Sequence, residues 1–171
     1  MTNNFPHRPL SKWPEPLKVF LISFLLLLTC GVSVGLFYLF TTTSFSPTGT
    51  IEHYKGSTIT ADSLLDFPEK YAKPASELLL TTHNHVIGFS FIFFILCGLF
   101  YFNSTISGRL KNFLLVEPFI STWLTFASIW GLKYIDTYFV YLTFMAALLT
   151  YSSFFFLVII LLYELRYKKK H

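Results

Sequence analysis

A chain of 171 residues that is 53% hydrophobic, 20% aromatic and only 13% charged is too apolar for a water-soluble fold, since soluble domains usually carry about 25% charged residues. The formal net charge of +4 does not indicate nucleic-acid binding, because Lys168, Lys169 and Lys170 directly follow an apolar segment, where lysines anchor a helix to anionic lipid. The composition therefore indicates an integral membrane protein.

The first predicted membrane segment covers residues 19–40, and a loop of residues 41–77 follows it. About 20 apolar residues are needed to cross a bilayer, because its hydrocarbon core is about 30 Å thick and an α-helix rises about 1.5 Å per residue. The loop opens with the turn-rich sequence SFSPTGT, and we expect a short amphipathic helix around Ala61–Leu65 on the membrane surface. No other predicted connection has room for a feature of its own.

The second segment covers residues 78–102 and contains two histidines, His83 and His85. A helix that begins near Pro74 puts them two or three turns in, roughly 13–17 Å from its start. Residues two apart on a helix point about 200° apart, so the two rings cannot easily bind one ion while the helix stays regular. We expect one ring to face the bundle and the other to face a different neighbour.

The third segment, 113–132, is diluted by serine and threonine, and the fourth, 137–163, has no charged residue. Only a few residues connect them, which predicts an antiparallel hairpin. The predicted fold is therefore all-α: one membrane domain of residues 1–171, built as an up-down-up-down four-helix bundle.

Glu117 stands directly before Pro118 at the start of the third segment. One interpretation is an ion pair with Arg109 or Lys111. The other is a proton relay towards the histidines, for which a row of hydroxyls at helical spacing supplies one face of the third segment. Packing between helices explains that row equally well; its members are Ser121, Thr125 and Ser128.

Basic residues are unevenly distributed between the two ends of the predicted bundle. Nine lie before the first segment, between the second and third, or after the fourth, whereas the other end has four. The positive-inside rule therefore predicts that both termini are cytoplasmic and that loop 41–77 faces outward.

Three of the five histidines fall on the outward side: His53 in the loop, and His83 and His85 in the second segment. Neutral imidazole is a common ligand of zinc, copper and iron. With Glu52 and Glu77 nearby, these residues form a candidate transition-metal site for copper or zinc. Alternatively, His53 and one helix histidine are axial ligands of a haem b. Hydrogen bonding of the rings to hydroxyls of other helices stays open as a purely structural use.

Three short sequences occur in order along residues 45–130: HYKG at 53–56, FPEKY at 67–71 and SELLLTTHNH at 76–85. In these the chain resembles a family of small four-helix bacterial inner-membrane proteins with HY[KR]G, FPKS-like and THxH sequences. FPEKY departs slightly from the family pattern. The family carries no established activity, so the resemblance implies a shared site of His53, His83 and His85 in a multi-pass protein of the bacterial inner membrane, and it implies no reaction.

Three functions fit these features. The first is a metal- or haem-binding accessory of a respiratory or other redox complex in the membrane. The second is a non-catalytic scaffold or assembly subunit of a larger membrane complex, and the third is a conduit for protons or small solutes. The expected partners are the lipid bilayer and other membrane subunits, and not nucleic acid. The sequence has no glycine-rich phosphate loop, no nucleophile beside a base and no paired carboxylates, so no enzymatic reaction is indicated.

Overall fold

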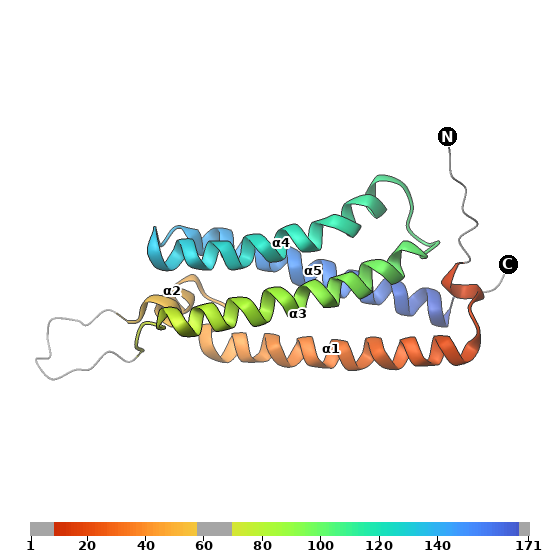
Figure 1. The fold of residues 1–171 in the computed structure, drawn as a ribbon, viewed down its shortest axis with the longest axis horizontal. Helices are drawn as coiled ribbons and strands as arrows, with labels where there is room; N and C mark the ends of the chain where they lie inside the picture. The colour runs from red at the N-terminus through yellow and green to blue at the C-terminus, as the bar shows by residue number, and fades with distance from the viewer. Residues whose placement is uncertain (1–8, 58–69, 168–171) are drawn as a thin grey trace, which may run out of the picture.

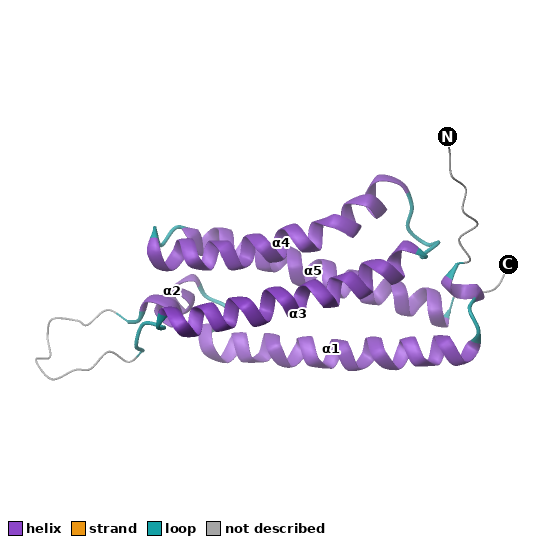
Figure 2. Cartoon of the chain, in the orientation of Figure 1, coloured by secondary structure: helices purple, strands orange, loops and turns teal. Residues whose placement is uncertain are grey.

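The computed structural model describes residues 9–57 and 70–167. Within these ranges the chain consists of helices and loops, without a β-strand (Figure 2). The four long helices lie along the same axis with α2 at one end of the bundle (Figure 1), and this confirms the predicted all-α bundle. In chain order the elements are the 3-10 helix η1 (Leu10–Lys12), α1 (Glu15–Thr43), α2 (Pro47–Lys55), α3 (Ala75–Tyr101), α4 (Gly108–Tyr134) and α5 (Phe139–Arg166).

The four long helices, α1, α3, α4 and α5, are each long and apolar enough to cross a membrane. The predicted segments 19–40 and 113–132 lie inside α1 and α4, and the other two differ from α3 and α5 by a few residues at their ends. Helix α3 begins directly after Pro74, close to the predicted start, and Pro74 precedes the first turn instead of lying in it. The helices extend past the apolar windows because their polar end turns continue the same hydrogen-bonded backbone.

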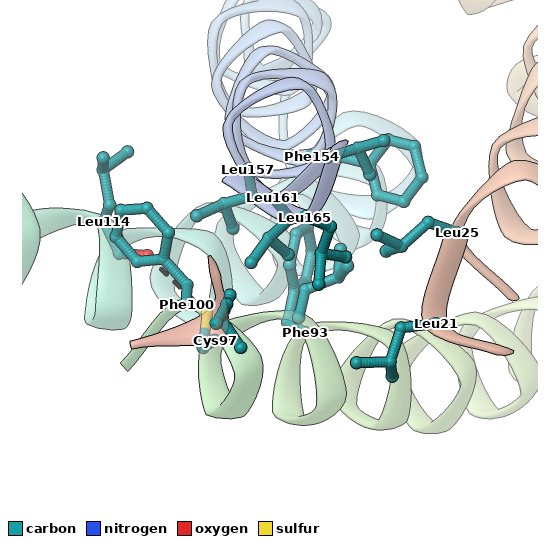
Figure 3. Packing of buried hydrophobic residues seen from close by; sticks show 13 residues of the cluster. Leu21, Leu25, Phe93, Cys97, Phe100, Leu114, Phe154, Leu157, Leu161 and Leu165 are labelled. Carbon is teal, nitrogen blue, oxygen red and sulfur yellow. Dashed lines mark hydrogen bonds between the residues drawn. The ribbon is translucent and has the colours of Figure 1, made fainter. Parts of the chain in front are cut away.

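Two clusters of buried apolar side chains hold the helices together. The larger lies in the half of the bundle where α1 begins and α5 ends, and Figure 3 shows α1, α3, α4 and α5 all contributing to it. Its members Leu25, Phe93 and Phe154 are fully buried. The smaller cluster joins Tyr54 of α2 to the other end of the bundle. Helix α1 buries apolar side chains only near its start, so its second half is loosely covered by the other helices.

Helices α4 and α5 form the predicted antiparallel hairpin, and hydroxyl groups line the seam between them. The Oγ atom of Ser128 lies 2.8 Å from Oγ1 of Thr143, and Oγ1 of Thr150 donates to Oγ of Ser121 at 3.0 Å. Further along the seam, Ser153 donates to Oε2 of Glu117. These hydroxyl pairs, and the bond from Ser153 to Glu117, connect the two helices with polar bonds inside otherwise apolar surroundings.

Pro118 lies inside α4 without ending it, and one side chain replaces the missing backbone bond. Proline has no N–H, so the carbonyl of Leu114 loses its usual partner four residues on. The Sγ atom of Cys97 on α3 donates to this carbonyl at 3.6 Å. The hydroxyl of Thr122 donates to the carbonyl of Pro118 at 2.7 Å. Glu117 consequently lies nine residues into a continuous helix, about 13 Å from its start, and deeper than the sequence suggested.

Helix α2 occupies part of the predicted loop 41–77, where the sequence indicated only turns. Ser46 caps its first turn by accepting a hydrogen bond from the Gly49 N–H at 3.0 Å, and Pro47 suits the first helical position. A Cβ atom at Gly49 would lie 2.2 Å from the Thr43 carbonyl oxygen, so glycine lets α2 fold back tightly against the end of α1. The amphipathic helix expected around Ala61–Leu65 lies outside the described residues.

The connection between α3 and α4 is tied to α5 by a fully buried carboxyl group, that of Glu164. Its oxygens accept from the side chain of Asn103, from the backbone N–H of Ser104 at 2.9 Å and from its Oγ at 2.7 Å, and from Oγ1 of Thr105 at 3.1 Å. Lys111 donates to the carbonyls of Tyr101 and Asn103 in the same connection. This end of the bundle is therefore held by polar bonds as well as by apolar packing.

Candidate ligand-binding site

His53 of α2 and His85 of α3 line one cavity of about 140 Å³ at the α2 end of the bundle. All five α-helices contribute to its walls. His83 lies elsewhere: its side chain is exposed and borders a separate hollow of about 350 Å³ beside Trp123 and Trp130. The expectation that His83 and His85 face different neighbours is thus confirmed, and of the three predicted histidines two come together.

The ring of His85 is held in a defined orientation. Its Nδ1 lies 2.9 Å from the carbonyl oxygen of Thr81, one turn earlier in α3. A carbonyl can only accept, so the proton of the neutral ring is on Nδ1 and the lone pair is on Nε2. Phe126 of α4 lies beside the ring, with the centroids 5.6 Å apart. In this tautomer Nε2 of His85 is available as a hydrogen-bond acceptor or as a metal ligand.

His53 is half-buried. Its ring is nearly perpendicular to the ring of Tyr54, with an interplanar angle of 85° and the centroids 5.0 Å apart. Burial, together with the positive charges of Lys73 and Lys70, lowers the pKa of His53 from 6.5 to about 4. An imidazole with this pKa is uncharged at neutral pH. The cavity wall therefore includes an uncharged imidazole, that of His53, as well as the ring of His85.

We expect His53 to remain uncharged down to about pH 4, which NMR titration of the labelled imidazole in lipid nanodiscs would measure. Lys73→Gln removes one of the two nearby positive charges and is expected to raise the pKa of His53. Lys133→Gln, at the end of α4 beside Tyr134, is the control and should leave it unchanged. A wild-type His53 that titrates near 6.5 would contradict the described environment.

The same shift makes the stability of the fold depend on pH. Between pH 6.5 and about 4 the unfolded chain binds a proton at His53 and the folded chain does not. The contribution of this residue is therefore complete above pH 6.5 and is lost as the pH falls to about 4.

Three tyrosines complete the cavity wall: Tyr38 of α1, Tyr54 of α2 and Tyr151 of α5. Burial, and the proximity of Tyr38 and Tyr151, raise the pKa of Tyr54 to about 12, so its hydroxyl stays protonated. Phenol groups can donate to an oxygen atom of a ligand. Tyr38 and Tyr151 were not predicted as site residues, because one residue in five is aromatic and lipid contact explains most of them.

The two acidic residues of the predicted metal site do not join the cavity wall. Glu52 forms an ion pair with Lys70, with 3.6 Å between Oε2 and Nζ. Glu77 is exposed in the first turn of α3. Across residues 9–57 and 70–167, no three His, Cys, Asp or Glu side chains cluster closely enough to hold a metal ion.

A groove of about 800 Å³ runs between α1 and α3 and adjoins the cavity. The two hollows share Gly35, Tyr38, His85 and Tyr151. The other residues of the groove are almost all apolar, and they extend along α1 as far as Phe24. The cavity thus adjoins a groove on the side of the bundle where α1 and α3 lie.

Glu117 is buried between α4 and α5, with 7% of its surface exposed. Its Oε2 accepts from Ser153, and its Oε1 has no hydrogen-bond partner among the described residues. The expected ion pair with Arg109 or Lys111 is not formed within that part of the chain, because Lys111 bonds the α3–α4 connection instead. Thr125 and Thr143, at the far end of the hydroxyl seam, line the histidine cavity.

Comparison with known proteins places most of the chain in one family. Neither a curated protein nor a solved structure gives a significant match. Residues 44–171, which begin directly after α1, match a family model described as a transmembrane helical domain. The chain therefore belongs to this family of transmembrane helical domains.

Proposed function

We propose that this integral membrane protein binds a membrane-soluble aromatic ring with hydroxyl groups, of the quinol class, between His53 and His85. The observation that carries the proposal is the shared cavity: two imidazoles, of which His53 is uncharged, and three tyrosines from four helices border one small space. Ligand sites have this character, with mostly apolar walls and a few convergent polar groups.

The size of the cavity favours a single ring. A protein cavity of about 150 Å³ holds one benzene molecule, and this one measures about 140 Å³. A haem has a ring system several times larger. The cavity alone would accept a six-membered ring, and any larger ligand has to extend into the adjoining groove.

The hydrogen-bonding groups suit a ring with two oxygens. A ligand hydroxyl donates to Nε2 of His85, which has the free lone pair. A tyrosine hydroxyl such as that of Tyr54, which is protonated, donates to the second oxygen. His53 is uncharged, and a neutral ligand adds no charge to the cavity, whose wall also includes Lys73.

A haem b or a copper or zinc ion held by His53 and His85 is the second candidate. One observation favours it: a backbone carbonyl fixes Nδ1–H of His85, which is how metal-binding histidines are oriented. His83, Glu52 and Glu77 would then have no part in the site, since they lie outside the cavity.

The cellular setting is part of the proposal. The distribution of basic residues supports an inner-membrane protein of bacteria with cytoplasmic termini and an outward-facing cavity. In that setting the protein serves as an accessory subunit of a redox complex, with a scaffold role as the alternative. Glu117 is then the group that exchanges protons with the cavity through the α4–α5 seam, and its unpartnered Oε1 supports this role.

Equilibrium binding to purified protein in lipid nanodiscs tests the proposal. We expect saturable binding of a tail-less ubiquinol analogue at one site per chain, with no haem absorption band before or after dithionite. If the analogue does not bind and a haem band or about one metal ion per chain is found, the second candidate is correct. If neither a ring, a haem nor a metal binds, the scaffold role remains.

A further inference from the structure

Helices α1 and α3 do not pack against each other along the groove between them. Three glycines border it: Gly31 and Gly35 on α1, and Gly88 on α3. A Cβ atom added at any of them would meet no other atom within 4 Å. Glycines spaced four apart in membrane helices usually allow two helices to touch, and here no helix touches them. Their effect is to keep the groove open.

The groove and the histidine cavity adjoin each other and have wall residues in common. Tyr38, His85 and Tyr151 border both, so a ligand whose ring sits in the cavity has its next atoms at the end of the groove. From Tyr38 to Phe24 the groove follows α1 for fourteen residues, about 21 Å of helix. Its walls beyond the shared residues are nearly all aliphatic or aromatic, and they match a long hydrocarbon chain.

We infer that the α1–α3 groove holds the hydrocarbon tail of the ligand whose ring binds in the histidine cavity. This inference rests on the proposed function and names the ligand more closely, as a quinol with a long isoprenoid or alkyl tail. Such a ligand reaches the cavity sideways from the lipid, because the groove opens on the face that α1 and α3 expose. Helix α1 lies outside the matched family domain, so this chain's own first helix supplies one wall of the groove.

The glycines provide a clean test, because a larger side chain there enters the groove without striking the protein. We expect Gly31→Leu and Gly88→Leu to fold normally, since leucine favours a helix more than glycine does. Each variant should lose about tenfold or more of the affinity for a long-tailed quinol and less than about twofold for its tail-less analogue.

Gly98→Leu is the matched control. Gly98 is also on α3 and also has no atom within 4 Å of an added Cβ, but it does not border the groove. Comparing each variant with wild type in the same nanodiscs cancels the partition of the tail into lipid.

The possible results separate the two proposals. The groove inference alone would be overturned if Gly31→Leu lowered the affinity for tailed and tail-less ligands equally. It would also be overturned if Gly98→Leu lowered the affinity for the tailed ligand as much as Gly31→Leu does. The same conclusion follows if the wild type binds the tail-less ring and no variant changes the affinities for tailed and tail-less ligands differently. Failure of the wild type to bind either ligand would overturn the proposed function and this inference together.

Discussion

Replacing Glu164 by alanine is expected to lower the free energy of unfolding by about 3–5 kcal/mol. The carboxyl group is fully buried and accepts hydrogen bonds from three consecutive residues of the α3–α4 connection. The variant removes the acceptor of the buried Asn103 side-chain amide, and an unsatisfied buried donor costs about 1–3 kcal/mol. It also leaves a cavity in the wall of α5.

Unfolding in mixed micelles, followed by circular dichroism, would measure this effect. Glu15→Ala is the control, because Glu15 makes an ion pair with Lys18 but its side chain is 72% exposed, and exposed pairs contribute little. The stability of Glu164→Gln should lie between those of Glu164→Ala and Glu15→Ala. The amide keeps one oxygen as an acceptor, but its NH₂ group can only donate and would face groups that also donate. A Glu164→Ala variant as stable as Glu15→Ala would show that the connection does not depend on the carboxyl group.

The sequence predicted the four membrane helices because length and hydropathy determine them directly. Helix α2 was missed because its residues, Pro47 and Gly49 among them, are typical of a turn. It forms because Ser46 caps it and because Tyr54 becomes buried against the bundle. The role of Glu164 was missed for a related reason: its partners are about sixty residues earlier in the chain, and no local spacing reveals that pairing.

The candidate site was predictable where it depended on helix geometry alone. The angle between residues two apart separates His83 from His85, and the structure places them at different hollows. That His53 shares the cavity of His85 depends on how α2 folds back on α1, which the sequence does not show. The depth of Glu117 was underestimated because Pro118 resembles a helix start, whereas the Cys97 thiol compensates for the missing N–H.

Replacing His85 by alanine is expected to weaken binding of the tail-less quinol by about tenfold to a hundredfold. The variant removes the Nε2 acceptor, so a ligand hydroxyl loses its partner in an apolar cavity. The fold should be largely unaffected, because within residues 9–57 and 70–167 the hydrogen bond of this ring goes to Thr81 in its own helix. Equilibrium binding in nanodiscs, alongside an unfolding curve for each variant, measures both quantities.

His83→Ala is the matched control for this experiment, since it removes the same side chain two residues away on the same helix. His83 borders the hollow beside Trp130 and not the cavity, so the variant should change quinol affinity by less than about twofold. Equal losses for the two variants would mean that the ligand does not contact His85 in the cavity. Loss of a haem band in His85→Ala alone would instead assign Nε2 to iron, because the same lone pair serves as acceptor for a hydroxyl or as ligand for a metal.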